Sequence, residues 1–404
     1  MLSPNWGVCE LKKVVVCGAP GKDVQIKIDD VRKLPPPFQK YLKRTIGYSK
    51  IPEAYGLQWN IDKVLEELNK RLIQPIYYSY GGRAPHVAYG VAKLGGRVVL
   101  VTAFGDDYDK AYDGFFGGGY WSHLLRSGVE MSLLEVEVPE ELFNEPRKLR
   151  KYLLERYGED LYNASVLKVA GRETPTIVCV KDQEGMDFYY IDDIKGAGVI
   201  ELGRPAPKKV LENGDIVFVT TSEAPFMEDA VNVASQLGKE VMVDIAVYTL
   251  THEAVRRILP KTHVVFGNPS ELKFVMDAFG VKRVEEIFDI TGTGFPKLIV
   301  QEDKFEGSIA VLSREGEEIR AGPIPINKTG NSVGCCDGMA AGFLALYQRG
   351  ARLELCIKAG LVEAASIWEV EGVQEGMLDK EGLIARYRKL FGEEAKEVAE
   401  VLSQ

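Results

Sequence analysis

The sequence lacks any apolar run long enough to cross a membrane. Residues 339–347 form one of its longest apolar runs, whereas a bilayer-spanning helix needs roughly 18 such residues. We therefore expect neither a membrane segment nor a signal peptide.

Cysteine and histidine are scarce, and their spacing does not suit a metal site or a disulfide framework. The six cysteines show no Cys-x-x-Cys spacing, and the four histidines are scattered along the chain. Reduced thiols in a cytoplasmic compartment are the simplest account. Cys335 and Cys336 are adjacent, but a disulfide between neighbours is strained, so plain thiols are favoured over a redox pair.

An excess of positive charge is missing as well. The chain has 50 Lys and Arg residues against 59 Asp and Glu, a formal net charge of -9. This balance argues against nucleic acid or an anionic membrane as the main partner. The 46% hydrophobic and 27% charged residues are typical of a folded globular protein, and 404 residues suit two to three domains or one α/β unit with appendages.

What the sequence does contain is an alternation of apolar strands and amphipathic helices. From residue 216 onward, the predicted strands cover residues 216–220, 241–243, 264–266 and 298–300, and the predicted helices cover residues 227–237 and 253–258. Residues 13–17 and 98–102 are further predicted strands. Continuously apolar strands that alternate with helices predict βαβ units on a parallel sheet covered on both faces.

Three other segments predict a small, half-exposed sheet beside this body. Residues 24–28 alternate between apolar and polar side chains, as in a strand with one wet face. Residues 176–180 and 188–191 flank the turn sequence 182–185, which predicts a β-hairpin.

The remaining long segments have helical composition. Residues 33–72 and 138–161 are expected to be helical insertions near the small sheet, and residues 383–402 to form a single surface helix.

Two common nucleotide signatures fail in this sequence. Residues 18–22 resemble the end of a P-loop, but Asp23 stands where a Ser or Thr would hold Mg²⁺. Residues 292–294 lack the third glycine of a dinucleotide fingerprint, and residues 117–119 follow no clear strand. NAD binding therefore has no support.

The strongest local signal lies in residues 329–343, where small residues open a helix. Amides at a helix start, together with the positive end of the helix dipole, can hold an anion. Asp337 falls in the first turn, where a carboxylate can take a proton from an attacking hydroxyl while the amides hold phosphoryl oxygens. The alternative is that Asp337 only complements the helix dipole.

Two weaker motifs also open helices. Asn268, Pro269 and Glu271 satisfy the rule for a capping box, and alternatively Asn268 and Glu271 organise Mg²⁺ and its waters near phosphates. Gly81-Gly82-Arg83 precedes another helix and is typical of a tight turn at which backbone can approach a ligand closely.

Taken in order, five motifs occur between about residues 12 and 375: Gly18 with Asp23, Gly81-Gly82, Gly105-Asp106-Asp107, Asn268 with Glu271, and Gly334-Cys335-Cys336-Asp337. In this order they resemble the ribokinase-like carbohydrate kinases of the phosphofructokinase B type.

The resemblance implies an α/β fold with a doubly wound, mostly parallel sheet, a small β-sheet lid and helical insertions. We expect residues 1–22, 86–127 and 195–404 to form the α/β core with the nucleotide and catalytic site, and residues 23–85 and 128–194 to form the lid with its insertions. Pairing of two copies through the lid is a further expectation.

The implied function is transfer of a phosphoryl group from a nucleotide to a hydroxyl of a sugar, nucleoside or sugar phosphate. MgATP is the usual donor, and ADP is not excluded. The alternative is a catalytically weak relative that binds nucleotide or sugar as a regulator.

The resemblance also assigns residue roles. Asp337 would be the base beneath an anion hole formed by the amides from Gly334 through Cys335 and Cys336 to Asp337. Asp23 would bind acceptor hydroxyls, and Gly81 with Gly82 would form the lid hinge. Glu271, and Asn268 through water, would organise Mg²⁺.

The chain departs from the family pattern at several positions. Cys335 and Cys336 replace Ala and Gly, and Asn331 replaces an Asp that helps to bind a monovalent cation. Residues 301–303 replace a Thr-x-Gly motif beside the nucleotide, which leaves the donor open.

Two positively charged or titratable residues near the expected hinge each have two interpretations. His86 stands where the family has a substrate-binding Asn, and it would either contact substrate or cap a helix. Arg83 would either bind a phosphate already on the acceptor or form a surface ion pair.

Overall fold

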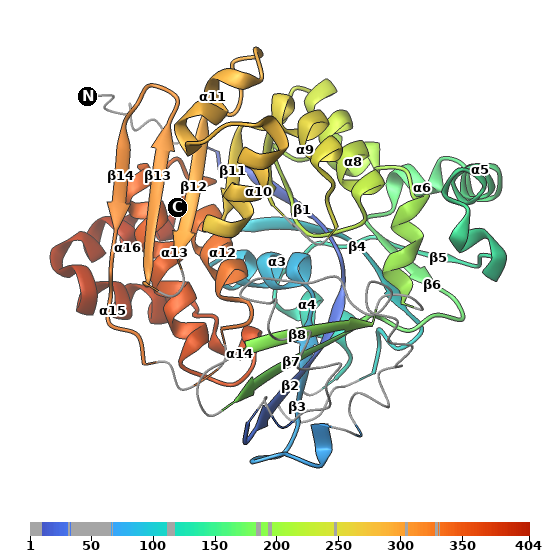
Figure 1. The fold of residues 1–404 in the computed structure, drawn as a ribbon, viewed down its shortest axis with the longest axis horizontal. Coiled ribbons are helices and arrows are strands. Elements are labelled where there is room, and N and C mark those ends of the chain that lie inside the picture. Colours follow the sequence, from blue (N-terminus) through green and yellow to red (C-terminus); the bar gives the residue numbers. More distant parts are fainter. Residues whose placement is uncertain are drawn as a thin grey trace.

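The computed structural model describes residues 10–30, 33, 66, 68–110, 118–182, 187–192, 196–245, 249–303, 306–327, 330 and 332–404. Within these residues, ten strands form one large sheet in the order β14-β13-β12-β11-β10-β9-β1-β4-β6-β5 (Figure 1). The strands are β1 (Lys13–Cys17), β4 (Arg97–Gly105), β5 (Leu133–Val136), β6 (Val166–Val169), β9 (Ile216–Val219), β10 (Glu240–Asp244), β11 (Val264–Gly267), β12 (Leu298–Asp303), β13 (Ser308–Ser313) and β14 (Glu318–Ala321). Strand β13 pairs antiparallel with both β12 and β14, and the other pairings in the sheet are parallel.

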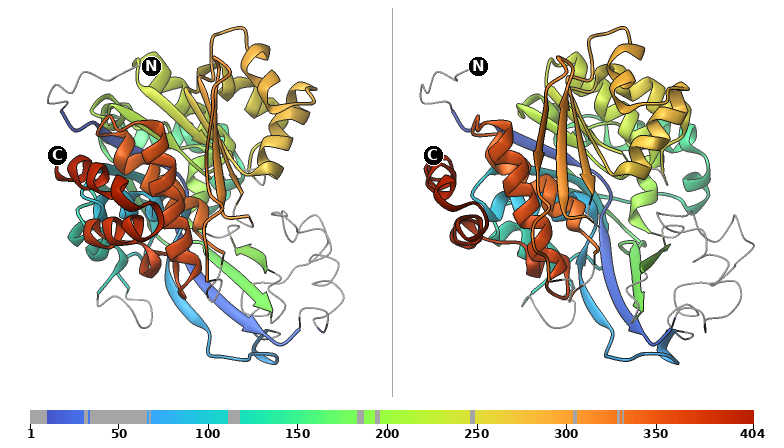
Figure 2. Two further views of the ribbon diagram at one scale, coloured as in Figure 1. Left: turned by 90° about the vertical axis from the view of Figure 1, so that its left-hand side faces the viewer. Right: turned by 60° about the vertical axis from the view of Figure 1, so that its left-hand side comes forward.

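The predicted βαβ architecture is confirmed, because both faces of this sheet are covered. Along β1, Val14 and Val16 join one apolar core, whereas Val15 and Cys17 join the other, as expected when successive side chains point to opposite faces. Figure 2 shows helices on both sides of the sheet. The first core includes residues of α3 (Arg83–Lys93), α12 (Cys335–Tyr347) and α13 (Leu353–Trp368), and the second includes residues of α8 (Ala224–Gln236), α9 (His252–Ile258), α10 (Pro269–Phe279) and α11 (Ile287–Ile290).

A second sheet projects from this body and is called the lid sheet below (Figures 1 and 2). Its four strands have the order β3-β2-β7-β8 and comprise β2 (Gly21–Ile28), β3 (Tyr77–Gly81), β7 (Thr176–Asp182) and β8 (Asp187–Asp192). The predicted hairpin is confirmed, since β7 and β8 pair antiparallel. Only residues 18–20 separate β1 from β2, so one continuous segment crosses from the core into the lid.

The structure corrects the predicted domain boundaries. Residues 128–194 were expected in the lid, but β5 and β6 belong to the large sheet, where β6 pairs with both β4 and β5. The helical insertion is confirmed as η3 (Glu140–Asn144), α5 (Pro146–Tyr157) and α6 (Asp160–Asn163), yet its apolar side chains pack on this edge of the core. The first part of the chain to return to the lid is therefore β7.

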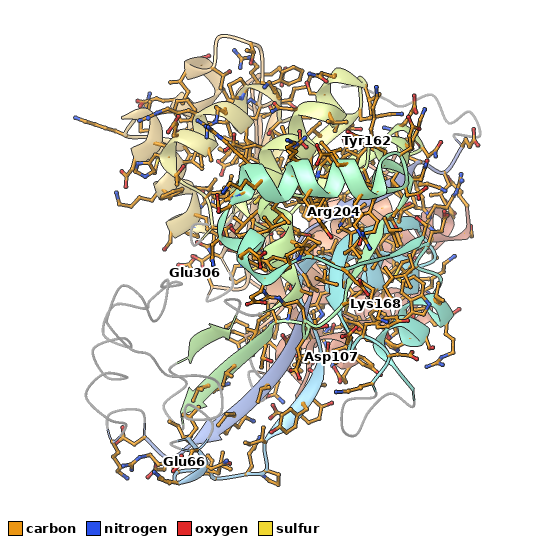
Figure 3. The ribbon with its side chains drawn as sticks, turned by 90° about the vertical axis from the view of Figure 1, so that its right-hand side faces the viewer. Glu66, Asp107, Tyr162, Lys168, Arg204 and Glu306 are labelled. Carbon is orange, nitrogen blue, oxygen red and sulfur yellow. The ribbon has the colours of Figure 1, made fainter. Side chains whose placement is uncertain are left out.

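A buried arginine strengthens this edge of the sheet (Figure 3). Arg204 is 1% exposed, and its guanidinium donates to the carbonyls of Thr102 at 2.7 Å, Ala164 at 3.1 Å and Ser165 at 2.8 Å. These bonds join β4 to the residues that lead into β6. They therefore attach the segment before β6 to the large sheet and not to the lid sheet.

The carboxyl-terminal region is also more divided than predicted. Instead of one helix over residues 383–402, the chain forms α15 (Lys380–Phe391) and α16 (Ala395–Ser403). Gly392, with a φ of 64°, ends the first helix, because this left-handed conformation interrupts a right-handed helix. The described residues also form the α-helices α4 (Tyr120–Arg126), α7 (Lys208–Glu212) and α14 (Val373–Gly376) and the short 3-10 helices η4 (Ala197–Leu202), η5 (Leu259–Lys261), η6 (Val284–Glu286) and η7 (Gly392–Glu394).

Two further expectations concern the first predicted insertion and the absence of a membrane segment. Residues 34–65, most of the first predicted insertion, lie outside the described residues. In the described part of the chain, no helix has both the length and the apolar character needed to cross a membrane.

Candidate active site

The candidate site lies where the large sheet meets the lid sheet. The segments that follow β1, β9, β10 and β11 leave the same edge of the parallel sheet, and in open α/β folds this carboxyl edge is where ligands bind. The start of α12 reaches the same region, because Arg83, which follows the lid strand β3, contacts Asp337 in its first turn.

Arg83 is the centre of a charged cluster. Its Nε lies 3.0 Å from Asp337 Oδ1, its Nη2 lies 2.6 Å from Asp244 Oδ2, and its Nη1 donates to Thr221 Oγ1 at 3.2 Å. The side chain is only 12% exposed. The interpretation of Arg83 as a surface ion pair is therefore wrong, because both of its carboxylate partners are buried.

Sequence reasoning missed Asp244, which ends β10. Burial raises the pKa of Asp244, whereas the positive charge of Arg83 and a hydrogen bond from Thr220 oppose this rise. The Thr220 hydroxyl donates to Asp244 Oδ2 at 2.8 Å. The available signal was an acidic residue at the carboxyl end of a buried parallel strand.

The start of α12 has the backbone that the predicted anion hole needs. Gly334 has a φ of 73°, and a Cβ at this position would lie 2.2 Å from Val373, so only glycine fits. Amides in the first helical turn lack intrahelical acceptors, although the amide of Cys335 reaches the Ser332 carbonyl at 3.4 Å. Asp337 is 4% exposed and lies in this first turn.

The cysteines at this helix start are thiols, as predicted. Among the described residues, Cys17, Cys179, Cys335, Cys336 and Cys356 are all buried and free of disulfides. Asn331, the predicted departure in a cation site, lies outside the described residues.

Both interpretations of the Asn268–Glu271 motif find support. The capping box is formed, because Asn268 Oδ1 accepts from the amides of Ser270 and Glu271 at 2.9 and 3.0 Å, and Glu271 Oε2 accepts from the Asn268 amide at 2.8 Å. The other oxygen, Glu271 Oε1, is buried without a hydrogen-bond partner.

This orphan oxygen is suited to a cation. Burial raises the pKa of Glu271 well above its usual range, the charges of Asp244 and Glu302 raise it further, and Arg83 opposes the rise. A divalent ion would satisfy the unpaired oxygen and offset the repulsion. No group of three or more metal-ligating side chains occurs in the described ranges, so most ligands of such an ion would come from phosphates and water.

The acceptor side of the site is built around Asp23, which is 2% exposed on β2. His86 Nε2 lies 3.0 Å from Asp23 Oδ2. A Cβ on Gly81 would lie 2.2 Å from Asp23 Oδ1, and Gly82 has a φ of 93°, so the two glycines are needed for two different reasons. Gly82, not His86, occupies the N-cap of α3. The interpretation of His86 as a helix cap is therefore wrong.

The Gly105-Asp106-Asp107 motif anchors the lid instead of entering the charged cluster. Asp107, labelled in Figure 3, pairs with Lys22 at 2.7 Å and accepts from the Thr174 amide at 2.7 Å. Asp106 accepts from the Gly171 amide at 2.7 Å. Asp107 therefore links the start of β2 to the segment that precedes β7, and Asp106 holds that same segment.

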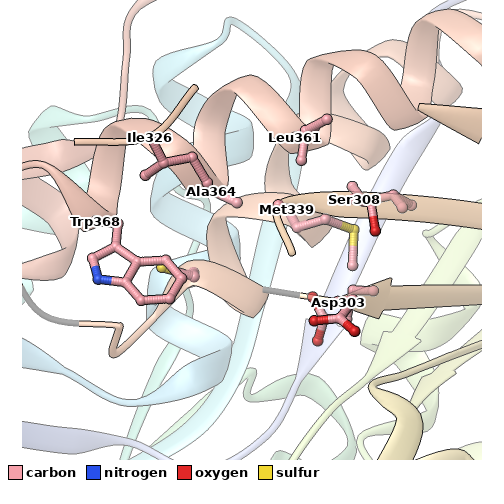
Figure 4. A pocket seen from close by; sticks show the side chains of 11 residues that line it. Asp303, Ser308, Ile326, Met339, Leu361, Ala364 and Trp368 are labelled. Carbon is pink, nitrogen blue, oxygen red and sulfur yellow. The ribbon is translucent and has the colours of Figure 1, made fainter. Parts of the chain in front are cut away.

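An apolar pocket lies beside the start of α12 (Figure 4). It is lined by Glu302, Asp303, Gly307, Ser308, Ile309, Ile326, Cys335, Met339, Leu361, Ala364 and Trp368. The pocket therefore has an indole and aliphatic side chains on its walls, with acidic residues of β12 at one side. Cys335 belongs both to this pocket and to the predicted anion hole.

Residues 157–380, more than half of the chain, match the pfkB family of carbohydrate kinases. The chain belongs to this family. It is accordingly a small-molecule kinase, a phosphotransferase that uses a nucleotide and an alcohol acceptor, as the motif order predicted.

Individual relatives of this pfkB kinase agree with that assignment. A nucleoside kinase of Methanothermobacter thermautotrophicus is 23% identical over 343 residues, which cover 84% of this chain and 95% of that protein. A cytidine kinase of Thermococcus kodakarensis is 26% identical over 314 residues, with coverages of 76% and 92%. The structure of Burkholderia thailandensis nucleoside kinase with inosine has a TM-score of 0.66 at 15% identity, with coverages of 94% and 98%.

Proposed function

We propose that this kinase phosphorylates a hydroxyl of an uncharged nucleoside, with MgATP as donor. The observation that carries the proposal is a pair of buried carboxylates, Asp337 at the start of α12 and Asp23 on β2. Burial raises the pKa of Asp23 most, and the charge of Asp337 raises it further, so the charges of the two carboxylates interact. An acceptor hydroxyl held by Asp23 would therefore lie within reach of Asp337.

The charges on the acceptor side favour an uncharged acceptor. The charge of Asp337 raises the pKa of Asp23, and the charge of Asp23 in turn raises that of Glu375. Glu375, which raises the pKa of His86, is thus a third carboxylate of this region. A phosphate group on the acceptor would meet these negative charges. We therefore assign Arg83 to the transferred phosphoryl group and not to a phosphate on the acceptor. The names of the two relatives, a nucleoside kinase and a cytidine kinase, support a nucleoside as acceptor.

In this mechanism, the Asp337 carboxylate accepts the proton of the acceptor hydroxyl as its oxygen attacks phosphorus. The amides at the start of α12 hold the oxygens of the transferred group, and the helix dipole adds to their effect. Arg83, which contacts Asp337, would stabilise the same negative charge. Bound MgATP would supply the phosphoryl group and leave as ADP, and its metal would help to neutralise the negative charge on the phosphates.

The residues that would hold the donor follow from the geometry. Glu271 Oε1 is the unpaired oxygen that would order the hydrated Mg²⁺, with Asn268 acting mainly as the cap that fixes Glu271. The apolar pocket beside Trp368 would hold the base of the nucleotide. Because Cys335 connects this pocket to the first turn of α12, a bound base would place its phosphates toward the anion hole.

The lid sheet would exclude water from this reaction. Lys181 donates to the Gly330 carbonyl, Lys27 pairs with Glu371, and the Gly372 amide donates to Gln25 Oε1 at 3.3 Å. These contacts join β2 and β7 to the segments that flank α12 and α14. Exclusion of water keeps the phosphoryl group for the intended acceptor.

A direct assay tests the proposal. Purified protein is mixed with MgATP or MgADP and with cytidine, inosine, adenosine, ribose or fructose 6-phosphate, and the phosphorylated product is quantified at several temperatures. We expect turnover with at least one nucleoside and MgATP, and none with the Asp337→Asn variant. Turnover confined to the sugar phosphate would overturn the acceptor assignment, and turnover confined to MgADP would overturn the donor assignment.

A further inference from the structure

A fully buried hydrogen-bond network lies behind Asp23, and its centre is Gln374 on α14. Gln374 Nε2 lies 3.3 Å from His86 Nδ1 and donates to the Tyr120 hydroxyl at 3.1 Å, while Gln374 Oε1 lies 2.7 Å from His123 Nε2. These four side chains are at most 5% exposed, since Tyr120 and Gln374 are 0% exposed, His86 2% and His123 5%. The network thus joins helices α3, α4 and α14.

The bond from Tyr120 to the Gly81 carbonyl fixes the orientation of the Gln374 amide. The Tyr120 hydroxyl donates its one proton to the Gly81 carbonyl at 2.6 Å, so it must accept from Gln374, and the group facing it is the amide nitrogen. The amide oxygen then faces His123. Burial lowers the pKa of His123 to about 4, so this ring is neutral and donates through Nε2–H.

The same reasoning fixes the proton of His86. The second hydrogen on Gln374 Nε2 points to His86 Nδ1, which must therefore accept, and His86 carries its proton on Nε2. That N–H donates to Asp23 Oδ2 at 3.0 Å. Burial lowers the pKa of His86, but the bond to Asp23 and its charge give a net rise. A second proton on Nδ1 would face the Gln374 amide hydrogens, so Gln374 opposes the doubly protonated ring.

We propose that His86 and Gln374 are positioning residues for the acceptor: Gln374 selects the His86 tautomer, and His86 holds Asp23 as an ionised carboxylate that accepts bonds from acceptor hydroxyls. The inference rests on the proposed role of Asp23. His86 does not touch the acceptor, because both of its ring nitrogens are engaged within the protein. The bond from Tyr120 to Gly81 ties the same network to the hinge, so the orientation of Asp23 and the position of the lid are set together.

Two substitutions of His86 separate this role from simple packing. In His86→Gln the amide nitrogen can occupy the place of Nε2 and donate to Asp23, whereas His86→Leu fills similar space without a donor. We expect His86→Leu to raise the KM for the best nucleoside by roughly 10-fold to 30-fold, with the KM for MgATP changed less than about 2-fold. His86→Gln should stay within roughly 3-fold of the wild-type acceptor KM.

Gln374→Met provides an independent test that leaves His86 in place. Without the Gln374 amide, His86 is no longer restricted to the tautomer that carries its proton on Nε2. We expect a rise in acceptor KM of roughly 5-fold to 10-fold, again without a matching change in the KM for MgATP. The exposed residue His252 offers a matched control, since His252→Gln should change neither KM.

The outcomes distinguish this inference from the proposed function. If Asp23→Asn leaves the acceptor KM unchanged, the role of Asp23 in the proposed function fails. If Asp23→Asn raises that KM while His86→Leu, His86→Gln and Gln374→Met all match the wild type, the positioning role is overturned and the proposed function stands. Equal KM changes in His86→Leu and His86→Gln, or equal changes for acceptor and donor, would also overturn it. If His86→Leu does not fold, Gln374→Met compared with His86→Gln decides the question.

Discussion

In the candidate active site, the buried polar groups of the two halves are stabilised in different ways. On the donor side, Asp337, Asp244 and Glu271 are carboxylates, and one arginine compensates two of them. On the acceptor side, Asp23 lies at one end of a chain of hydrogen-bonding side chains formed by His86, Gln374, Tyr120 and His123. Charge is concentrated where a phosphoryl group would move, and directed hydrogen bonds where a neutral acceptor would be recognised.

This difference predicts which kinetic constant each half controls. Charged groups that act on the moving phosphoryl group should affect kcat, because they stabilise charge that develops in the transition state. Groups that orient the acceptor should affect its KM. If variants on the donor side change the acceptor KM instead of kcat, this division of roles between the two halves is wrong.

The largest effect is expected from Asp337. Asp337→Asn keeps the size of the side chain but removes the base, so kcat should fall by about 10²-fold to 10⁴-fold with nearly unchanged nucleotide affinity. Steady-state kinetics combined with nucleotide titration would measure both. A variant with kcat close to that of the wild type would show that Asp337 only complements the dipole of α12.

Arg83 should give the next largest effect. Arg83→Ala removes the charge that faces Asp337 and Asp244, and we expect kcat to fall by about 10²-fold while the acceptor KM changes less than about 3-fold. Arg83→Lys keeps the charge but cannot bridge both carboxylates, so it should recover only part of the loss. If Arg83→Ala instead raises the KM of a phosphorylated acceptor by 10-fold or more, the original interpretation of Arg83 as an acceptor-phosphate site is correct.

Glu271 should show a smaller effect that depends on metal. Glu271→Gln retains an oxygen that can accept from the Asn268 amide, but it loses the charge on the unpaired side. The Mg²⁺ concentration for half-maximal activity should rise by roughly 5-fold to 10-fold with little change in Tm. A lower Tm with an unchanged Mg²⁺ dependence would mean that Glu271 acts only in the capping box.

The smallest expected effect concerns stability in acid and tests the neutral half of the site. Burial lowers the pKa of His123 from 6.5 to about 4, so between these pH values the unfolded chain binds a proton that the folded chain does not. Folding stability from this residue is therefore present above pH 6.5 and is lost as the pH falls toward 4.

His123→Gln should reduce this dependence, because an amide can donate to Gln374 Oε1 without titrating. Between pH 7 and pH 4.5 we expect the Tm of the wild type to fall by roughly 2 to 5 °C more than that of His123→Gln. Parallel Tm curves for the two proteins would show that His123 is not kept neutral by its surroundings.

Much of the fold follows from local sequence patterns, and its corrected parts depend on pairing between distant segments. The continuously apolar strands β1, β9, β10 and β11 were recognisable because parallel strands are buried on both faces. Residues 133–136, with the sequence Leu-Leu-Glu-Val and with only Val136 buried, form a short strand that gave no such signal. Its place beside β6 comes from tertiary pairing. For this reason the predicted lid boundary was wrong.

The same distinction holds for the site. Asp337, Glu271 and the Gly81-Gly82 pair were found because each belongs to a local motif. Asp244 and Gln374 were missed, since a single polar residue carries no pattern until the fold brings it to a partner. Homodimer formation through the lid sheet stays a prediction.

The burial of the five described cysteines affects how readily their thiols react. Oxidants and alkylating reagents attack the thiolate, and burial raises the pKa of Cys17 to about 12 and shifts that of Cys356 upward as well. Cys335 and Cys336 are shielded from solvent by the packing around the first turn of α12. Helix α12 thus begins with two buried thiols, and we expect activity to persist without a reducing agent.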